Sequence, residues 1–274
     1  MKSKTHEFLR EDIGSGDITS DLVIPSAETA KGRIICKEDC VLAGLAEASE
    51  IFEELGARVV KSRKDGVPAK RGDVVLEVKG PAKALLAGER LALNMIMRMS
   101  GIATLTDALV KKCRKSNPKV RVAATRKTTP GFREFEKRAV RLGGGDPHRM
   151  GLYDAVLIKN NHIAIAGGVA EALKRAKHGS FTKKIEIEVE TEKDAYTALA
   201  NGADIIMLDN FEPKNAKKLI KELKAKRPDV LIEVSGGIRP DNIDKYASAA
   251  DIISLGWLTH SVKSVDFSMK IEKT

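Results

Sequence analysis

A repeated alternation of short β runs and helix-like stretches constrains the fold of this chain more than any other feature. Six β runs follow Asn117-Pro118, at residues 120–125, 155–159, 185–190, 204–209, 230–235 and 251–255. Helix-like stretches lie between several of them, at residues 168–177, 192–201 and 214–226. Strands that helices separate by about 20–35 residues are typical of parallel βα units. The sequence therefore predicts a parallel sheet covered by helices.

The length of this region limits the kind of βα fold. A closed barrel of eight βα units needs about 250 residues, and residues 120–260 are too few for one. We therefore expect an incomplete barrel or a doubly wound sheet. Each β run ends in charged residues or close-set glycines, and the active sites of such folds lie at the carboxyl ends of the strands. The alternative is that the strands simply end in polar loops.

The first part of the chain has a different pattern. Residues 33–36 and 73–78 are predicted strands, and residues 46–55 are a predicted short helix. A long helix is predicted from about residue 82 to residue 99, with Pro81 in its first turn. These patterns separate an N-terminal region from the βα region.

Composition narrows the class of protein. The 274 residues include 48 Lys or Arg and 38 Asp or Glu, and the formal net charge of +10 favours anionic partners. No apolar run approaches the roughly 18 residues of a membrane helix, and the N-terminus lacks the apolar segment of a secretory signal. Cys36, Cys40 and Cys113 form no CxxC pair, which is typical of reduced thiols. Aromatic residues make up only 4%, few for stacking on single-stranded nucleic acid. We expect a cytoplasmic protein that binds neither a membrane nor a nucleic acid.

Carboxylates alternate along the β run at 185–190. Glu186, Glu188 and Glu190 share one face of the run, and the apolar residues between them share the other. In a βα barrel the apolar face packs on the helices, so the carboxylates would point inward. Together with Asp209 on the next β run, they would then bind Mg²⁺ or sugar hydroxyls. The alternative is an exposed edge strand with a solvated acidic face.

Basic residues gather between 121 and 149. Arg126, Lys127, Arg149 and the later Lys159 lie at strand ends or in a glycine-rich loop, and His148 precedes Arg149. Guanidinium groups match carboxylates with two hydrogen bonds, and Lys provides a point charge for phosphate. Convergent cations of this kind imply a substrate with several anionic groups. Three further cations, which have helical i, i+4, i+8 spacing, are expected on a solvated helix face: Arg133, Lys137 and Arg141.

Glycines follow the last two β runs. Ser235-Gly236-Gly237 and Gly256 are in the positions of a barrel phosphate site, where backbone amides approach a phosphate closely. Arg90 lies in the middle of an apolar face of the predicted long helix, between Leu86 and Leu93. A cation there needs an internal partner, such as the neighbouring Glu89, or an anion.

These features together resemble the quinolinate phosphoribosyltransferase family. The resemblance runs from Glu11 nearly to the C-terminus, and Asn160 departs from it where many members have an acidic residue. Its most specific stretches are Glu11–Thr19, Glu89–Asn94, Ser100–Thr104, Thr125–Thr128, His148-Arg149, Ile158-Lys159, Asn161-His162, Glu188, Asp209 and Ser235–Gly237. The resemblance implies an N-terminal α/β sandwich domain at 1–104, to which residues 262–274 return, and an open α/β barrel at 105–261. The family barrel has about seven strands, so one strand is expected beyond the six runs.

The resemblance also implies a reaction and roles for the site residues. Quinolinate would react with phosphoribosyl pyrophosphate to give nicotinate mononucleotide, pyrophosphate and CO₂. The implied catalytic residues are Lys127, Lys159, Glu188 and Asp209. Glu188 and Asp209 would hold ribose hydroxyls and, directly or through water, Mg²⁺. The implied substrate-binding residues are Arg90, Thr125, Arg126, Lys127, His148, Arg149, Lys159, Glu188, Asp209, Ser235, Gly236, Gly237 and Gly256.

The resemblance further implies a homodimer in which each subunit completes the other's site, or a hexamer of such dimers. Two other functions remain open. A relative on the same scaffold could use a different substrate, as nicotinate phosphoribosyltransferase and the related protein of molybdenum-transport loci do. A nucleic-acid-binding protein is the alternative from another class, and its affinity would fall steeply with salt.

Overall fold

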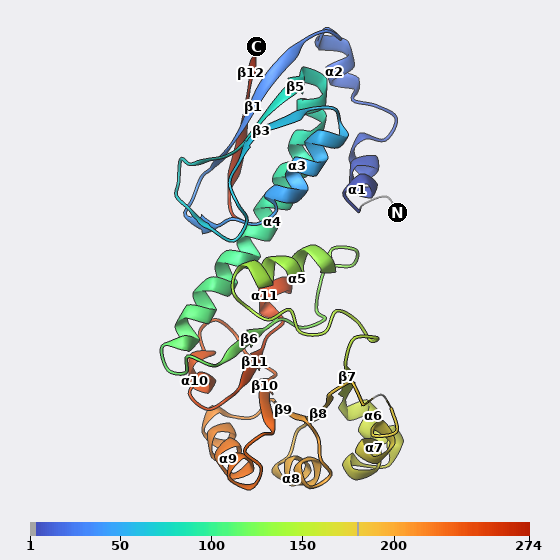
Figure 1. The fold of residues 1–274 in the computed structure, drawn as a ribbon, viewed down its shortest axis with the longest axis vertical. Helices are drawn as coiled ribbons and strands as arrows, with labels where there is room; N and C mark the ends of the chain where they lie inside the picture. Colours follow the sequence, from blue (N-terminus) through green and yellow to red (C-terminus); the bar gives the residue numbers. More distant parts are fainter. Residues whose placement is uncertain (1–3, 180) are drawn as a thin grey trace. The chain divides into compact units, whose positions relative to one another are not determined.

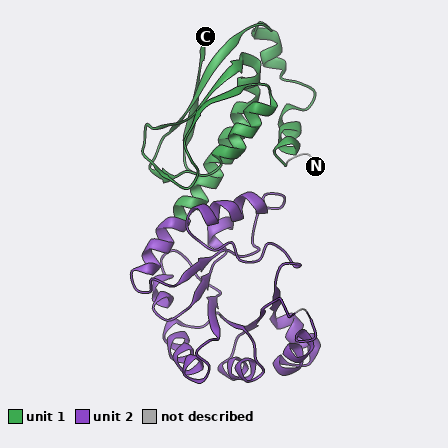
Figure 2. Ribbon diagram, viewed as in Figure 1, with its two compact units in different colours: residues 1–105, 262–274 green, residues 106–261 purple. Residues whose placement is uncertain are grey.

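The computed structural model describes residues 4–179 and 181–274. The chain divides into two compact units (Figures 1 and 2). Unit 1 comprises residues 1–105 and 262–274, and unit 2 comprises residues 106–261.

Unit 1 is built on an antiparallel sheet in the order β12-β1-β5-β3. The C-terminal strand pairs with β1 at one edge, where Ile34 lies opposite Met269. The elements of the unit are α1 (Lys4–Ile13), α2 (Ile18–Val23), β1 (Thr29–Cys36), β2 (Cys40–Val41), α3 (Leu45–Glu54), β3 (Arg58–Ser62), β4 (Pro68–Ala69), β5 (Val74–Pro81), the start of α4 (Ala82–Arg114) and β12 (Phe267–Lys273). The short strands β2 and β4 form a separate pair.

Helix α4 packs on one face of this sheet. A Cβ at Gly32 of β1 would lie 3.3 Å from Leu85 of α4, so a larger residue there would separate helix and sheet. Two expectations about α4 were wrong. Pro81 is the last residue of β5 rather than part of the helix, and the helix continues to Arg114. Gly101 does not end it: a Cβ at this residue would lie only 2.3 Å from the carbonyl oxygen of Lys263, so glycine is needed for close packing.

Unit 2 contains a parallel six-stranded sheet in the order β6-β11-β10-β9-β8-β7. Figure 1 shows the strands along an arc with α7, α8 and α9 on its outer side. Its elements are β6 (Arg121–Ala123), α5 (Arg133–Leu142), β7 (Val156–Ile158), α6 (Asn160–Ala166), α7 (Val169–Ala176), β8 (Ile185–Val189), α8 (Glu192–Ala200), β9 (Ile205–Asp209), α9 (Pro213–Lys226), β10 (Leu231–Ser235), α10 (Asp244–Ala247), β11 (Ile252–Ser254) and α11 (Trp257–His260). All six predicted β runs are strands, and the expectation of an open α/β barrel is confirmed.

The expected seventh strand is reduced to a single bridge. Asp146 pairs in parallel with Ala123 of β6, and its amide donates to the carbonyl of Val122 at 2.8 Å. Pro147 follows without an amide hydrogen, and the backbone of His148 is left-handed, with φ 54°. The strand therefore stops after one residue, and the sheet stays open between Asp146 and β7.

None of the helices in residues 4–179 and 181–274 combines the length and the apolar composition needed to cross a membrane.

Candidate active site

A cavity of about 600 Å³ lies at the carboxyl ends of the parallel strands of unit 2. It brings together all the predicted site residues except Arg90. The predicted residues that line it are Thr125, Arg126, Lys127, His148, Arg149, Lys159, Glu188, Asp209, Ser235, Gly236, Gly237 and Gly256. Every β run that was predicted to end in polar residues or glycines thus contributes to one cavity, as the prediction of a single site requires.

The carboxylates of β8 point inward. Glu186 and Glu188 are 3% and 6% exposed, although they are charged residues on a strand. Strand β8 lies between β7 and β9, so the alternative of an exposed edge strand is wrong. Glu190 follows the end of the strand and is exposed.

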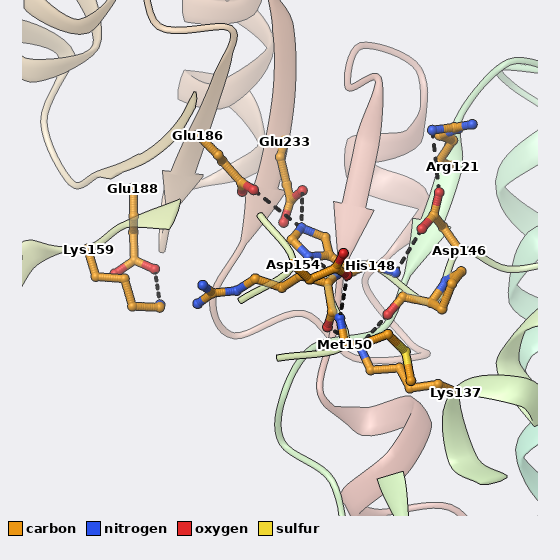
Figure 3. A network of polar contacts seen from close by, with 12 residues as sticks. Arg121, Lys137, Asp146, His148, Met150, Asp154, Lys159, Glu186, Glu188 and Glu233 are labelled. Atoms are coloured by element: carbon orange, nitrogen blue, oxygen red, sulfur yellow. Dashed lines mark hydrogen bonds and ion pairs between the residues drawn. The ribbon is translucent and has the colours of Figure 1, made fainter. Parts of the chain in front are cut away.

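Glu188 forms an ion pair with Lys159 at the cavity (Figure 3). Lys159 follows β7 and caps α6, where its amide donates to Nδ1 of His162 at 2.9 Å. Asp209 is the last residue of β9, and Asn210 Nδ2 donates to its Oδ2 at 2.7 Å. Burial raises the pKa of Asp209, and the negative charge of Glu188 raises it further. A cation or hydroxyl donor near both carboxylates would be stabilised there.

Two guanidinium groups face the cavity without carboxylate partners. Arg126 follows β6 and is exposed, whereas Arg149 is 8% exposed. Within the described chain, neither guanidinium has a hydrogen bond or an ion pair. Burial lowers the pKa of Arg149, and the positive charge of Arg126 lowers it further. Glu186 and Glu188 act on Arg149 only through their charge, which raises its pKa. Both guanidinium groups therefore keep their hydrogen-bond donors for a substrate anion.

Beneath these groups, His148 contacts two buried carboxylates (Figure 3). Its Nε2 lies 3.5 Å from Glu186 Oε2 and 3.3 Å from Glu233 Oε2, and Glu233 has no exposed surface. Its Nδ1 accepts a hydrogen bond from the Arg149 amide at 2.8 Å.

The same contacts locate the protons of this cluster. Burial alone would lower the pKa of His148, but the hydrogen bonds and charges of Glu186 and Glu233 raise it to about 10. Burial raises the pKa of Glu186. Since Nδ1 is occupied as an acceptor, these contacts favour a proton on Nε2, between the ring and the two carboxylates.

Two groups of carboxylates come into question for a metal. The ligand atoms of His148, Glu186 and Glu233 lie within 4.8 Å of one another. There, both carboxylates already have the imidazole of His148 as their partner. Glu188 and Asp209 fit better, because both line the cavity and the charge of Glu188 acts on Asp209.

The glycines next to the cavity are required by their backbone conformation or by close neighbours. Gly236 and Gly237 have φ of 80° and 60°, and a Cβ at Gly236 would lie 2.4 Å from Oδ1 of Asn210. A Cβ at Gly256 would lie 2.8 Å from Lys127 Cδ. Backbone at these turns is therefore open to a phosphate, as expected from the sequence.

Sequence reasoning missed the support beneath the site. Lys137 of α5 is 1% exposed, and its Nζ donates to the carbonyls of Pro147 and, at 3.1 Å, Arg149. Its assignment to a solvated face was wrong, because that face of α5 packs under the loop. Arg133 is also bound, to Thr128 Oγ1 at 2.9 Å. Glu233 was missed as well, although it shares the inward face of β10 with Ser235.

Arg90 is in unit 1, on α4, and its side chain is exposed rather than enclosed by an apolar stripe. No internal partner such as Glu89 contacts it in residues 4–179 and 181–274.

Comparison with known proteins gives the family. The profile of the quinolinate phosphoribosyl transferase N-terminal domain matches residues 17–100, and that of the C-terminal domain matches residues 102–270. The chain belongs to this family.

Individual relatives agree over nearly the whole chain. A probable nicotinate-nucleotide pyrophosphorylase (carboxylating) of Methanocaldococcus jannaschii is 51% identical over 271 residues, which cover 96% of this chain and 94% of the relative. The human nicotinate-nucleotide pyrophosphorylase (carboxylating) is 39% identical over 269 residues, 96% of this chain and 89% of the human protein. The crystal structure of NadC from Streptococcus pyogenes has a TM-score of 0.91 and 39% identity, and covers 98% of this chain and 95% of that one.

Proposed function

We propose that this chain transfers the phosphoribosyl group of phosphoribosyl pyrophosphate to quinolinate, with loss of CO₂, to give nicotinate mononucleotide and pyrophosphate in NAD biosynthesis. The family membership supports this reaction. The observation that carries it is the pair of unpartnered guanidinium groups, Arg126 and Arg149, in one cavity with Glu188 and Asp209. The two guanidinium groups match the two carboxylates of a dicarboxylate. The carboxylates of Glu188 and Asp209 suit a sugar ring that develops positive charge.

Arg126 and Arg149 bind the two carboxylates of quinolinate. A planar guanidinium can donate two parallel hydrogen bonds to a carboxylate, which also fixes the orientation of the pyridine ring. Orientation matters because the ring nitrogen must approach the ribose C1 in line with the leaving pyrophosphate. Thr125 supports the loop of Arg126, since its Oγ1 accepts from the Lys127 amide at 3.1 Å.

Glu188 and Asp209 hold the ribose and stabilise its transition state. Positive charge builds at the ribose C1 as pyrophosphate leaves, and fixed carboxylates next to the ring lower the energy of that charge. Lys127 and Lys159 neutralise phosphate oxygens at the other side of the sugar. The 5′-phosphate is held by the turns at Ser235, Gly236, Gly237 and Gly256.

Loss of CO₂ follows the transfer. Once the pyridine nitrogen is bonded to ribose it carries a positive charge, and this charge accepts the electron pair that the departing CO₂ leaves at C2. A proton then replaces CO₂ at that carbon. The site residues bind and orient the ring, and no covalent enzyme intermediate is needed.

Glu188 and Asp209 are also the residues that would hold Mg²⁺, directly or through water. The ion would supply positive charge to the pyrophosphate leaving group. The raised pKa of Asp209 beside Glu188 supports this assignment, because a cation would relieve the repulsion between the two carboxylates.

We extend the proposal to a homodimer with shared sites, or a hexamer of such dimers. Arg90 is exposed and has no partner in residues 4–179 and 181–274, so it is available to the site of a partner subunit. Ile18, Leu22 and Val23 of α2 are 76%, 80% and 65% exposed, and apolar side chains in such a group fit a surface that a partner covers. A cytoplasmic location stays a prediction from the three free cysteines.

Product detection tests the reaction. Quinolinate, nicotinate and nicotinamide are each incubated with phosphoribosyl pyrophosphate and Mg²⁺, and pyrophosphate and the nucleotide product are measured. We expect release of pyrophosphate with quinolinate alone. Equal turnover of nicotinate would contradict the dicarboxylate argument and favour the alternative substrate. Salt-sensitive binding of DNA or RNA without turnover of any of the three would favour the nucleic-acid function.

A further inference from the structure

The loop that carries Arg149 is held by an unusual number of side chains. The His148 amide donates to Asp146 Oδ1 at 2.8 Å, and the Met150 amide donates to Asp154 Oδ2 at 2.8 Å. From below, the buried Lys137 donates to the carbonyls of the loop (Figure 3). So many contacts on one short loop indicate that its conformation matters.

His148 is in the centre of this arrangement, and both of its ring nitrogens are in use. Nδ1 accepts from the Arg149 amide at 2.8 Å, and Nε2 faces Glu233 and Glu186 at 3.3 and 3.5 Å. A neutral imidazole has one donor and one acceptor. The ring therefore has no hydrogen-bonding atom left for a substrate carboxylate.

The backbone of His148 is in the left-handed region, with φ 54°. A non-glycine residue adopts this conformation at an energetic cost, and such residues are frequent at functional sites. Here the conformation turns the imidazole back toward the following amide. The contact between Nδ1 and the Arg149 amide depends on it.

We propose that His148 is a positioning residue, which fixes Arg149 for the quinolinate carboxylate, and that the buried Glu186 and Glu233 in turn fix the imidazole. The proposal rests on the proposed function for the identity of the substrate. It changes the role expected from the sequence, where His148 was a direct ligand of quinolinate. Glu233 lines the wall of the cavity, but it has no exposed surface and faces the ring. In this arrangement the carboxylates orient the ring, and the ring orients the next residue.

The tautomer of His148 tests the proposal without any turnover. Protein with ¹⁵N-labelled histidine is studied by two-bond ¹H–¹⁵N correlation, and the spectrum of H148N identifies the signals of His148 among those of the five histidines. We expect an unprotonated Nδ1 and a protonated Nε2, with and without quinolinate. A protonated Nδ1, or a change of tautomer when quinolinate binds, would overturn the proposal.

Two substitutions separate the ring nitrogens. The side-chain oxygen of Asn lies where Nδ1 does and can accept from the Arg149 amide, whereas the nitrogen of Gln lies where Nε2 does and can donate to Glu233. We expect the KM for quinolinate to rise about tenfold in H148Q, as for loss of one hydrogen bond, and clearly less in H148N. The KM for phosphoribosyl pyrophosphate should move in neither. The opposite order, with H148Q less affected, would mean that Nε2 contacts the substrate.

A second pair of variants tests the carboxylate beneath the ring. E233Q retains an oxygen that accepts from Nε2, whereas E233L has a similar volume and no acceptor. We expect E233Q to raise the KM for quinolinate less than E233L does, and equal effects would contradict the orienting role. If the wild type does not turn over quinolinate, the proposed function fails, and the tautomer of His148 still decides the proposal for the ring.

Discussion

Strand β8 presents two inward carboxylates with different surroundings (Figure 3). Glu188 pairs with Lys159, whose side chain is 43% exposed, and both line the cavity. Glu186, two residues earlier, faces His148 near the fully buried Glu233, and its Oε1 has no hydrogen-bond partner among the described residues. One strand therefore contributes to two layers: a layer at the cavity that meets the substrate, and a layer beneath it that supports the loop of Arg149.

The difference has a physical cause. A carboxylate at the cavity can exchange its cation partner for substrate groups, because water and Lys159 stabilise its charge in either state. A buried carboxylate such as Glu186 is shielded from solvent, so it needs a proton or a fixed donor instead. Residues at the cavity can therefore respond to the charges of a substrate, whereas the buried residues keep the loop of Arg149 in one conformation.

The largest effect is expected where the two layers are compared directly. E188Q retains the shape of the side chain and removes the charge next to the ribose, so we expect kcat to fall by about 10²–10³, the scale of losing one electrostatic contact to a transition state. E186Q is the matched control, with a smaller loss of kcat and a rise in the KM for quinolinate. Steady-state kinetics with both substrates measure this. Equal losses of kcat would remove the distinction between the layers.

The next prediction concerns the cavity layer alone. R126K retains the charge and removes the fork of the guanidinium. We expect quinolinate binding to weaken by about 1.5–3 kcal/mol, the scale of a charged hydrogen bond. Titration calorimetry measures it, and R141K, at an exposed position of α5 outside the cavity, serves as the control. Unchanged affinity in R126K would show that Arg126 is only a surface charge.

The buried layer is tested by the pH dependence of stability. Burial, with the charge of Arg133, lowers the pKa of Lys137 from 10.5 to about 8. Between these two values the unfolded chain binds more protons than the folded one, so stability should rise with pH through this window. From pH 8 to pH 10 the free energy of unfolding should increase by roughly 2 kcal/mol.

Urea unfolding of the wild type and K137M measures this gain, since other groups that titrate in this window contribute to both proteins. The rise should be smaller in K137M by this amount and unchanged in K221M, where an exposed lysine of α9 is replaced. The same rise in K137M would mean that Lys137 is not buried as a cation.

The layers also differ in how far the sequence predicts them. Residues of the cavity layer follow parallel strands, so the βα pattern alone brings Arg126, Lys159 and Asp209 to one edge. The alternation of residues along a strand predicts that Glu186 and Glu188 point inward. These predictions need only the period of a strand and the direction of the sheet.

The buried layer depends on contacts that no periodicity contains. Lys137 has the spacing of a solvated helix face, and only the loop above α5 makes that face internal. Glu233 follows two apolar residues in its strand, and its role depends on His148, far away in the sequence. The seventh strand consists of the single bridge residue Asp146, because Pro147 and the left-handed His148 end it. A single residue has no alternating pattern from which a strand could be predicted.

The last prediction has the smallest signal, a partial return of activity, and concerns whether the cavity layer is complete in one chain. Arg90 is exposed and has no partner among the residues that the structure describes, so we predict that it acts in the site of a partner subunit. R90A and K159A should each be inactive. Mixed one to one with subunit exchange, half of the dimers are heterodimers, and each has one site without either side chain and one site with both. About a quarter of wild-type activity should therefore return.

Subunit exchange has to be shown in the same mixture, by two different tags that are purified together. A chain that uses its own Arg90 would lack one group at every site, in homodimers and heterodimers alike. Activity that stays at the level of the separate variants after proven exchange would therefore place Arg90 outside a shared site. The cavity layer would then consist of unit 2 alone, with Arg126 and Arg149 as the guanidinium groups for quinolinate.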